Sequence, residues 1–335
     1  MTQFGFFGSD KYSLLKGEFT VQERQKNLEN LQENIETIIK GKPDAVRNAI
    51  IAMLAQGHLL IEDVPGVGKT TLAHLLARSI SCSFQRIQFT SDLLPSDILG
   101  VTVYDPERRD FDFKQGPIFS NIILADEINR TTPKTQSALL EAMNASQVSI
   151  DKVTYNLPKP FMVIATQNPI EFHGTFPLPK SQLDRFLIRL HIGYPDLSDE
   201  IIILKEQKTL GNLENVHSVL SAKDILQMQR EVESVTLDDD LLEYIGKIVA
   251  ATRNSPHIEL GVSPRGALAL RRVAQAKAYF ENRDYCIPDD IKSMINPVLA
   301  HRIQIAKTFE STALGGHRED EEVLNQVIAE VEVPL

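Results

Sequence analysis

Residues 58–71 constrain the fold most, because a short apolar run there meets a glycine-rich turn and then a helical pattern. The apolar run at 59–61 predicts a strand, and residues 71–78 predict a helix. Between them, Gly66 and Gly68 allow backbone N–H groups to curve around phosphate oxygens, and the start of the helix adds its partial positive charge. A strand, a glycine loop and a helix in this order predict a phosphate-binding loop.

The same loop carries the side chains that a nucleotide and its metal need. Lys69 is expected to reach the β- and γ-phosphates of ATP, and the Thr70 hydroxyl is expected to bind Mg²⁺. The loop departs from the common pattern G-x-x-x-x-G-K-T at one position, because Asp63 stands where the first glycine is usual. The residues expected to contact the nucleotide are Asp63, Pro65, Gly66, Val67, Gly68, Lys69, Thr70 and Thr71.

Further polar groups follow two later apolar runs, where ligands bind in parallel sheets. The run at 122–125 ends in Asp126, which is expected to hold Mg²⁺ through water, and Glu127, which is expected to orient and deprotonate the attacking water. The run at 161–166 is followed by Asn168, which would polarise that water from the opposite side. The alternative for Asn168 is an Asx turn before the next proline.

The remaining patterns predict an α/β fold followed by helices. Strands at 84–89 and within 183–192 bring the expected strands to five, and the strand-rich pattern ends near residue 195. We therefore expect a nucleotide-binding domain with leading helices at 1–195 and a separate helical domain with an acidic tail at 196–335. Helices of the second domain are expected at 199–210, 222–232, 238–253, 264–281 and 288–302.

The segments outside this frame carry weaker expectations. Helices at 21–39 and 44–55 predict a packing layer, and residues 40–44 between them are a candidate for contact with adenine. Residues 318–335 predict a peripheral helix or a docking tail. Their acidic and partly apolar composition fits both alternatives.

Two hairpins are expected inside the strand-rich part, at 101–114 and at 147–157, because apolar and polar residues alternate there around short turns. A short helix should precede the first hairpin, with Ser96 or Asp97 as its cap. Both hairpins are either plain surface structure or loops that contact a substrate.

Arg265 occupies the first turn of the helix expected at 264–281. A cation there opposes the helix dipole by a few tenths of a kcal/mol. This mismatch indicates that Arg265 binds an anion, for which phosphate is the natural candidate.

The composition narrows the cellular setting. A formal net charge of −10 argues against wholesale binding of a nucleic-acid backbone and leaves room only for a local basic channel. The two cysteines are too few for a disulfide framework, and the N-terminus lacks the layout of a signal peptide. The longest apolar run, at 49–55, is too short to span a bilayer. We therefore expect a cytoplasmic protein.

Together these motifs resemble the AAA+ ATPases, and more closely their MoxR branch, which belongs to the helix-2-insert clade and is related to magnesium chelatase subunit I. The resemblance covers about residues 30–305. Its strings are EDVPGVGKT at 62–70, LLPSDI at 93–98, LADEINR at 124–130, KTQSALLEAM at 134–143, ATQNP at 165–169, QLDRF at 182–186 and SPRG at 263–266.

The resemblance implies a P-loop NTPase core with a parallel five-stranded sheet flanked by helices, and a C-terminal all-helical lid domain. It further implies a ring, usually a hexamer, with ATP at the subunit boundary. Asn168 is then similar to the first sensor, and Arg185 to the arginine finger that reaches the neighbour's γ-phosphate. Arg265 is similar to the second sensor, acting in cis or in trans. A surface role or a pair with Asp184 is the alternative for Arg185.

For function, the resemblance implies ATP hydrolysis that remodels or matures a partner protein. MoxR-like proteins typically work with partners that carry a von Willebrand factor A (VWA) domain, for metal or cofactor insertion or for complex assembly. The alternatives are a motor subunit of magnesium-chelatase type, a nucleic-acid motor or loader, and a nucleotide-binding scaffold. The acidic balance disfavours the nucleic-acid motor.

Overall fold

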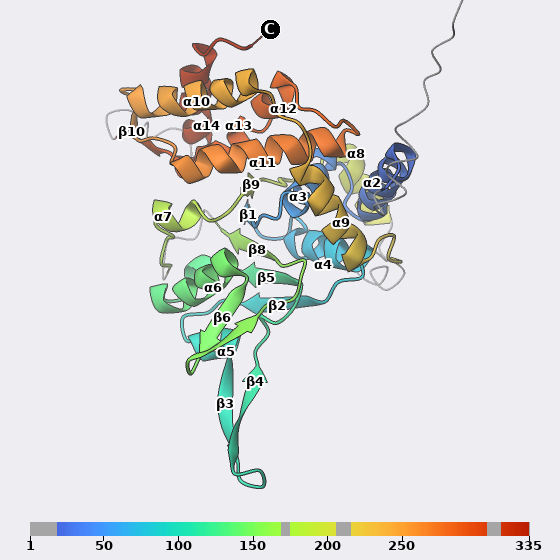
Figure 1. The fold of residues 1–335 in the computed structure, drawn as a ribbon, viewed down its shortest axis with the longest axis vertical. Helices are drawn as coiled ribbons and strands as arrows, with labels where there is room; N and C mark the ends of the chain where they lie inside the picture. Colours follow the sequence, from blue (N-terminus) through green and yellow to red (C-terminus); the bar gives the residue numbers. More distant parts are fainter. Residues whose placement is uncertain (1–18, 169–174, 206–215, 307–315, 335) are drawn as a thin grey trace, which may run out of the picture.

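The computed structural model describes residues 19–168, 175–205, 216–306 and 316–334, and one parallel β-sheet forms its centre (Figure 1). The strands have the order β2-β5-β8-β1-β9, and each neighbouring pair is parallel. Their bounds are β1 (Leu59–Glu62), β2 (Phe84–Gln88), β5 (Ile122–Asp126), β8 (Met162–Gln167) and β9 (Ile188–Leu190). The predicted five-stranded parallel sheet is confirmed.

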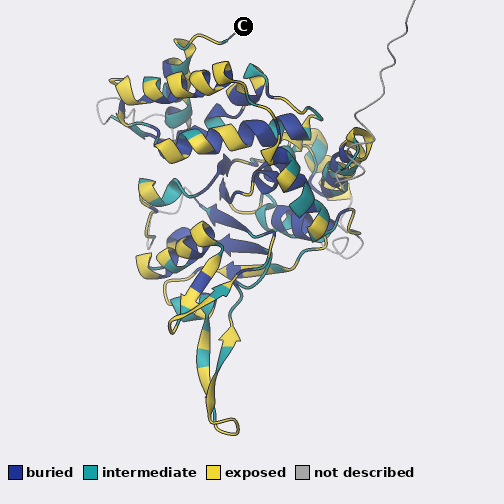
Figure 2. Ribbon diagram, in the orientation of Figure 1, coloured by how far each residue is buried: buried dark blue, intermediate teal, exposed yellow. Residues whose placement is uncertain are grey.

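Helices cover both faces of this sheet, which explains why its central strands are apolar throughout. Ile123 belongs to the buried cluster that contains residues of α6 (Pro133–Ala145), whereas the next residue, Leu124, belongs to the cluster that contains residues of α4 (Lys69–Ser79). Figure 2 shows these strands buried between the helices. The sheet therefore holds its carboxyl ends in fixed register, and the polar residues that follow the strands lie at one edge.

The leading helices pack on the α4 side of the sheet. They are α2 (Val21–Glu36), which ends three residues before the expected position, and α3 (Pro43–Leu54). A capping box starts α2: the Thr20 hydroxyl accepts from the Glu23 N–H at 3.2 Å, and the Glu23 carboxylate accepts from the Thr20 N–H at 3.0 Å. The predicted packing layer is confirmed, since α2 buries Leu28, Leu31 and Ile35.

A helical lid follows the sheet. Its elements are α8 (Leu197–Lys205), α9 (Ala222–Glu233), α10 (Asp239–Asn254), α11 (Pro264–Phe280), α12 (Pro288–Lys292), α13 (Ile295–Leu299), η3 (Ala300–Arg302) and α14 (Gly316–Ala329). A small antiparallel sheet of β10 (Ile258–Leu260) and β11 (Gln304–Ile305) is added to these helices. Residues 206–210 of the first predicted lid helix lie outside the described residues. The domain boundary between residues 195 and 196 stays a prediction. The two sides of this boundary are in contact, because the Gln229 side chain donates to the Met53 carbonyl at 2.7 Å.

The single helix predicted at 288–302 is wrong, because the chain breaks between α12 and α13 at Ser293 and Met294. The break places Pro297 in the first turn of α13, where the missing proline N–H costs little. In an unbroken helix the ring of Pro297 would clash with the carbonyl of Ser293.

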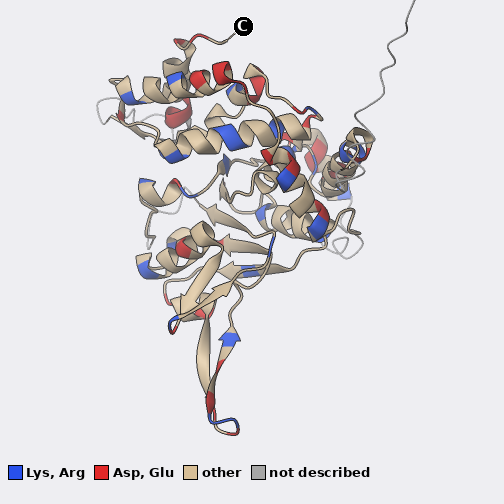
Figure 3. Cartoon of the chain, in the orientation of Figure 1, with Lys and Arg blue, Asp and Glu red and all other residues tan. Residues whose placement is uncertain are grey.

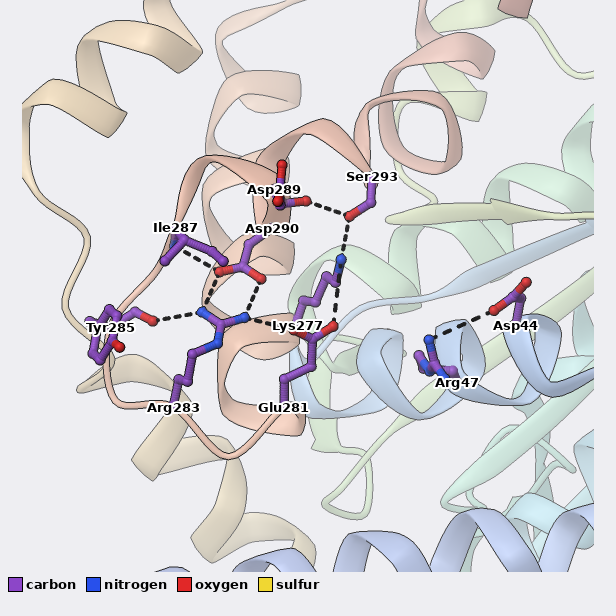
Figure 4. A network of polar contacts seen from close by, with 10 residues as sticks. All are labelled: Asp44, Arg47, Lys277, Glu281, Arg283, Tyr285, Ile287, Asp289, Asp290 and Ser293. Carbon is purple, nitrogen blue, oxygen red and sulfur yellow. Dashed lines mark hydrogen bonds and ion pairs between the residues drawn. The ribbon is translucent and has the colours of Figure 1, made fainter. Parts of the chain in front are cut away.

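Ion pairs fasten the turn that leads into α12 (Figure 4). Arg283 donates to both carboxylate oxygens of the fully buried Asp290, at 2.7 and 2.6 Å, and Asp290 also accepts from the Ile287 N–H at 2.8 Å. Arg283 further pairs with Glu281 at the end of α11. The lid thus has its own polar framework, separate from the sheet.

The cap predicted for the short helix before the first hairpin is wrong. The helix α5 (Pro95–Leu99) starts after Leu94, so neither Ser96 nor Asp97 is its cap residue; Asp97 lies in the first turn and accepts from the Leu94 N–H at 2.9 Å. The predicted C-terminal helix is confirmed as α14, and its exposed Glu322, Asn325 and Gln326 place one face of it at the surface. Leu324 of α14 is fully buried in the core.

Both predicted hairpins are present, as β3 (Gly100–Asp105) with β4 (Asp110–Gln115) and β6 (Gln147–Ile150) with β7 (Val153–Asn156). The first projects from the body on the side opposite the lid (Figure 1). The two hairpins touch: the Thr102 hydroxyl donates to Asp151 at 2.7 Å, and the rings of Phe113 and Tyr155 lie 4.4 Å apart between centroids.

Figure 3 shows charges of both signs on α10, whereas the charged residues of α11 are all Lys or Arg. Within the described ranges, none of the helices is both long enough and apolar enough to cross a membrane.

Candidate nucleotide site

The phosphate-binding loop predicted from sequence joins β1 to α4. Gly66 and Gly68 have φ values of +87° and +93°, a region that favours glycine. The helix α4 starts at Lys69, directly after Gly68. A cavity of about 340 Å³ lies in front of the loop. It is lined by Pro65, Gly66, Gly68, Lys69, Thr70, Thr71, Arg86, Asp126, Glu127 and Asn168.

The sheet brings the predicted polar groups to this cavity. Asp126 ends β5, and Asn168 directly follows β8, which pairs with β5 in parallel. Thr166 of β8 ties the two strands together: its hydroxyl donates to Asp126 Oδ1 at 2.6 Å and accepts from the Glu127 N–H at 2.8 Å. Asp126 and Glu127 from one apolar run and Asn168 from another therefore face the loop together.

Glu127 has a left-handed backbone, with φ +58° and ψ +50°. Its carboxylate oxygen Oε2 accepts from the Gln88 side-chain amide at 2.8 Å and pairs with Arg130 at 3.1 Å. The predicted base thus lies in the cavity with two donors on one oxygen.

Lys69 donates from Nζ to the backbone carbonyl of Asp63 at 2.6 Å. Partial burial away from water lowers the pKa of Lys69, while the nearby carboxylates of Asp63, Asp126 and Glu127 act in the opposite direction. Lys69 therefore brings a partly desolvated donor to the cavity, where it can bind phosphate oxygens.

Asp63 has a structural task that the sequence did not suggest. Its carboxylate oxygen Oδ2 accepts from the N–H groups of Ile192 and Gly193, at 2.7 and 2.6 Å, and Oδ1 accepts from the Val64 N–H at 2.9 Å. Asp63 is not among the residues that line the cavity in front of the loop, which we call the phosphate cavity. Its carboxylate fastens the loop to the segment after β9, so the predicted nucleotide contact of Asp63 stays a prediction.

A second cavity, of about 540 Å³, continues from the first, since Pro65, Gly66, Gly68 and Thr71 line both. Its other walls are mostly apolar. They are formed by Ile38, Ile39, Lys40, Lys42, Val67, Ile192, Gly193, Tyr194, Pro195, Glu200, Ile203 and Leu204. Within the predicted adenine segment 40–44, Lys40 and Lys42 lie at this cavity, which has the size and lining for a nucleoside.

Arg185 and Arg265 lie elsewhere, near the C-terminal half of α6. Arg185 donates to the Leu140 carbonyl at 2.7 Å, and Arg265 donates to Asn144 Oδ1 at 2.8 Å. Leu140 and Asn144 are about one turn apart on α6, so the two guanidinium groups lie near each other. Partial burial lowers the pKa of Arg185, and the charge of Arg265 lowers it further. Neither is among the residues that line the two cavities. Asp184 pairs with Arg302, so the alternative of an Arg185–Asp184 pair is wrong.

This geometry agrees with the comparisons with known proteins. Residues 58–188 match the model of the ATPase family associated with various cellular activities (AAA), and residues 250–327 match the AAA lid domain. Chaperone MoxR1 of Mycobacterium tuberculosis is 38% identical over 316 residues, which cover 92% of this chain and 82% of MoxR1. The chain belongs to the MoxR family of AAA ATPases.

Two further proteins are similar to this MoxR-family chain over most of its length. The uncharacterized protein YeaC of Bacillus subtilis is 46% identical over 303 residues, which cover 90% of this chain and 93% of YeaC. A crystal structure of a protein from Cytophaga hutchinsonii has a TM-score of 0.87 and 35% sequence identity, and covers 98% of this chain and all of its own. The fold of the core and the lid is therefore that of the family.

The MoxR-family site also contains residues that sequence reasoning missed: Arg86, Gln88, Arg130 and Thr166. Arg86 and Gln88 alternate on β2, whose register places Gln88 beside Asp126. Polar residues at alternate positions of a strand next to the acidic strand are the signal that could have found them. Strand order, however, is not readable from one sequence.

The donor set fits Mg²⁺. The Thr70 hydroxyl and the Asp126 carboxylate line the same cavity and offer oxygen atoms, which this cation prefers. Asp126 is mostly buried, so its position is well defined.

Proposed function

We propose that this MoxR-family protein hydrolyses ATP to ADP and phosphate with Mg²⁺, and uses the energy to remodel a partner protein. The observation that carries the proposal is the shared cavity of Lys69, Thr70, Asp126, Glu127 and Asn168. It combines a phosphate-binding loop, oxygen donors for a metal and a carboxylate base within one space.

In this mechanism each group has a separate task. The loop amides, together with Lys69, bind the phosphates, and Thr70 and Asp126 would hold Mg²⁺, which neutralises phosphate charge when bound. Glu127 accepts a proton from the attacking water, and Asn168 orients that water from β8. The apolar cavity beside the loop would receive the base of the nucleotide.

The position of Arg185 and Arg265 supports a ring in which ATP lies between subunits. Both guanidinium groups lie outside their own nucleotide cavities and are close together. We therefore expect them to reach the ATP of a neighbouring subunit, Arg185 as the arginine finger and Arg265 as the second sensor acting in trans. The hexamer implied by the family resemblance is our expectation for the ring.

For the partner, we propose a protein with a VWA domain. The support is the family membership and the name of the relative MoxR1, which is called a chaperone. The projecting hairpin β3–β4 is our candidate for client contact, since Val101, Val103, Tyr104 and Phe111 on it are exposed apolar side chains.

Glu127→Gln tests the proposal directly. The variant should bind ATP as the unaltered protein does, while phosphate release falls about 10²–10⁴-fold, the range for removing a general base. Glu322→Gln, an exposed change on α14, is the matched control and should keep the rate. Near-normal turnover in Glu127→Gln would remove Glu127 from its role. The same variant, kept in the presence of ATP, serves as the bait in a pull-down of a VWA-domain partner from lysate of the source organism.

A further inference from the structure

Arg86 brings a guanidinium group into the phosphate cavity, and the proposed reaction leaves it without a role. Its Nε and Nη2 atoms donate to Asp126 Oδ2 at 3.0 and 2.6 Å, and Nη2 also donates to Gln88 Oε1 at 2.7 Å. The other oxygen of Asp126 accepts from the Thr166 hydroxyl. Both oxygens of the carboxylate proposed to hold Mg²⁺ are therefore engaged, and one of them by a full positive charge.

The place of Arg86 along the two cavities indicates which part of a nucleotide it faces. Pro65, Gly66, Gly68 and Thr71 line both cavities, so the middle of a bound nucleotide would lie there. Arg86 lines only the phosphate cavity. It shares that end with Lys69, Thr70, Asp126, Glu127 and Asn168. This is the end far from the apolar base cavity, where the terminal phosphate would lie.

The two partners of the ion pair differ in freedom. The Asp126 side chain is 12% exposed, whereas the Arg86 side chain, which lines the cavity, is 49% exposed. Asp126 is also held by Thr166, so Arg86 is the group that can move. Its planar, permanently charged fork matches phosphate as well as carboxylate.

We infer that Arg86 is a nucleotide-sensing residue that exchanges partners. It neutralises Asp126 in the arrangement described here, and it turns to the γ-phosphate when Asp126 takes up Mg²⁺ with ATP. This inference rests on the proposed ATP site. Because ADP lacks the γ-phosphate, Arg86 gives the site a preference for ATP over ADP.

The affinity of the full chain for MgATP and for MgADP, measured by calorimetry, tests the exchange. Arg86→Ala should lower the ratio of MgATP affinity to MgADP affinity about tenfold or more, because only ATP loses a charge-assisted hydrogen bond, whereas the freed Asp126 favours the metal in both complexes alike. Arg86→Lys keeps the charge without the fork and should lie between. Arg130→Ala is the matched control, since that side chain is also 49% exposed but pairs with Glu127. It should change both affinities by a similar factor.

A second measurement tests whether Arg86 competes with a cation for Asp126. With Mn²⁺ as the probe and no nucleotide, Arg86→Ala should bind the cation about tenfold more tightly, because Asp126 loses a competing counter-ion. Equal losses for MgATP and MgADP, or unchanged Mn²⁺ binding, would overturn the inference. Thermal unfolding reports whether each variant is folded, and Arg86→Lys carries both measurements if Arg86→Ala is not. Failure of the unaltered chain to bind MgATP would instead contradict the proposed function.

Discussion

Gln88 and Glu127 are joined by a hydrogen bond of 2.8 Å from the Gln88 side-chain amide to Glu127 Oε2. Parallel pairing of β2 with β5 sets Gln88 beside Asp126, and the left-handed turn at Glu127 then brings the next carboxylate within reach. Arg86 donates to the same glutamine. The carboxylate proposed for the metal and the carboxylate proposed as base are therefore linked through two side chains of β2.

This link predicts the effect of Gln88→Ala. A hydrogen bond to a carboxylate oxygen restrains its direction and occupies a lone pair that could otherwise accept from water. Without the Gln88 amide, Glu127 should turn to water more readily, and the basal ATPase rate should rise about threefold or more, the effect of one weak hydrogen bond. Phosphate release in steady state measures this rate. Gln85→Ala on the same strand is the control, since Gln85 is exposed and pairs with Ile123 in the sheet. A fall of the rate in Gln88→Ala would mean that Gln88 holds Glu127 in its productive direction.

Asp63→Ala should destabilise the protein. The carboxylate is nearly buried and accepts three backbone N–H groups, and its loss leaves the amides of Ile192 and Gly193 without that acceptor. We expect a loss of about 2–4 kcal/mol in the free energy of unfolding, measured in urea. Asp44→Ala, at a carboxylate that is 87% exposed, should change it by less than about 0.5 kcal/mol. Equal stabilities of the two variants would contradict the structural task of Asp63.

His58 predicts a pH dependence of stability. The imidazole is buried, its Nδ1 accepts from the Val163 N–H at 3.0 Å, and its Nε2 hydrogen-bonds the Met143 carbonyl at 2.9 Å. Burial lowers the pKa of His58 from its ordinary 6.5 to about 4. Between these values the unfolded chain binds a proton that the folded chain does not, so stability is complete above pH 6.5 and is lost as the pH falls toward 4.

The expected loss from His58 is about 2 kcal/mol between pH 6.5 and 5. Urea unfolding at a series of pH values measures it, and His58→Gln should show a shallower slope over this interval. His301, whose pKa burial also lowers, keeps part of the slope in that variant. Identical slopes for the variant and the unaltered protein would exclude His58 as the source.

Features that depend on a few adjacent residues could be predicted from the sequence, whereas features that depend on the pairing of distant strands could not. The loop at Gly66 and Gly68 and the strand before Asp126 were predictable, because each depends on a few adjacent residues. Arg86 was not, since its meaning comes from the pairing of β2 with β5. The same holds for Asp63, whose acceptor role needs the segment after β9. The break before Pro297 was readable from the proline alone and was missed by following helical periodicity.

Arg185 gives a test of the ring itself. Its guanidinium lies outside its own cavity, so a role in catalysis requires a neighbouring subunit. Arg185→Ala should lower ATPase activity about 10³-fold, the effect of removing an arginine finger. Lys69→Ala should also be inactive, because it loses phosphate binding. Mixed rings, however, contain some interfaces where an intact Lys69 meets an intact Arg185. Mixing the two variants should therefore restore part of the activity, in proportion to the number of such interfaces.

The control mixture contains Arg271→Ala, an exposed change on α11, in place of Arg185→Ala. It should keep the activity expected from dilution alone. No recovery at any ratio, with rings confirmed by light scattering, would show that Arg185 does not act across the subunit boundary.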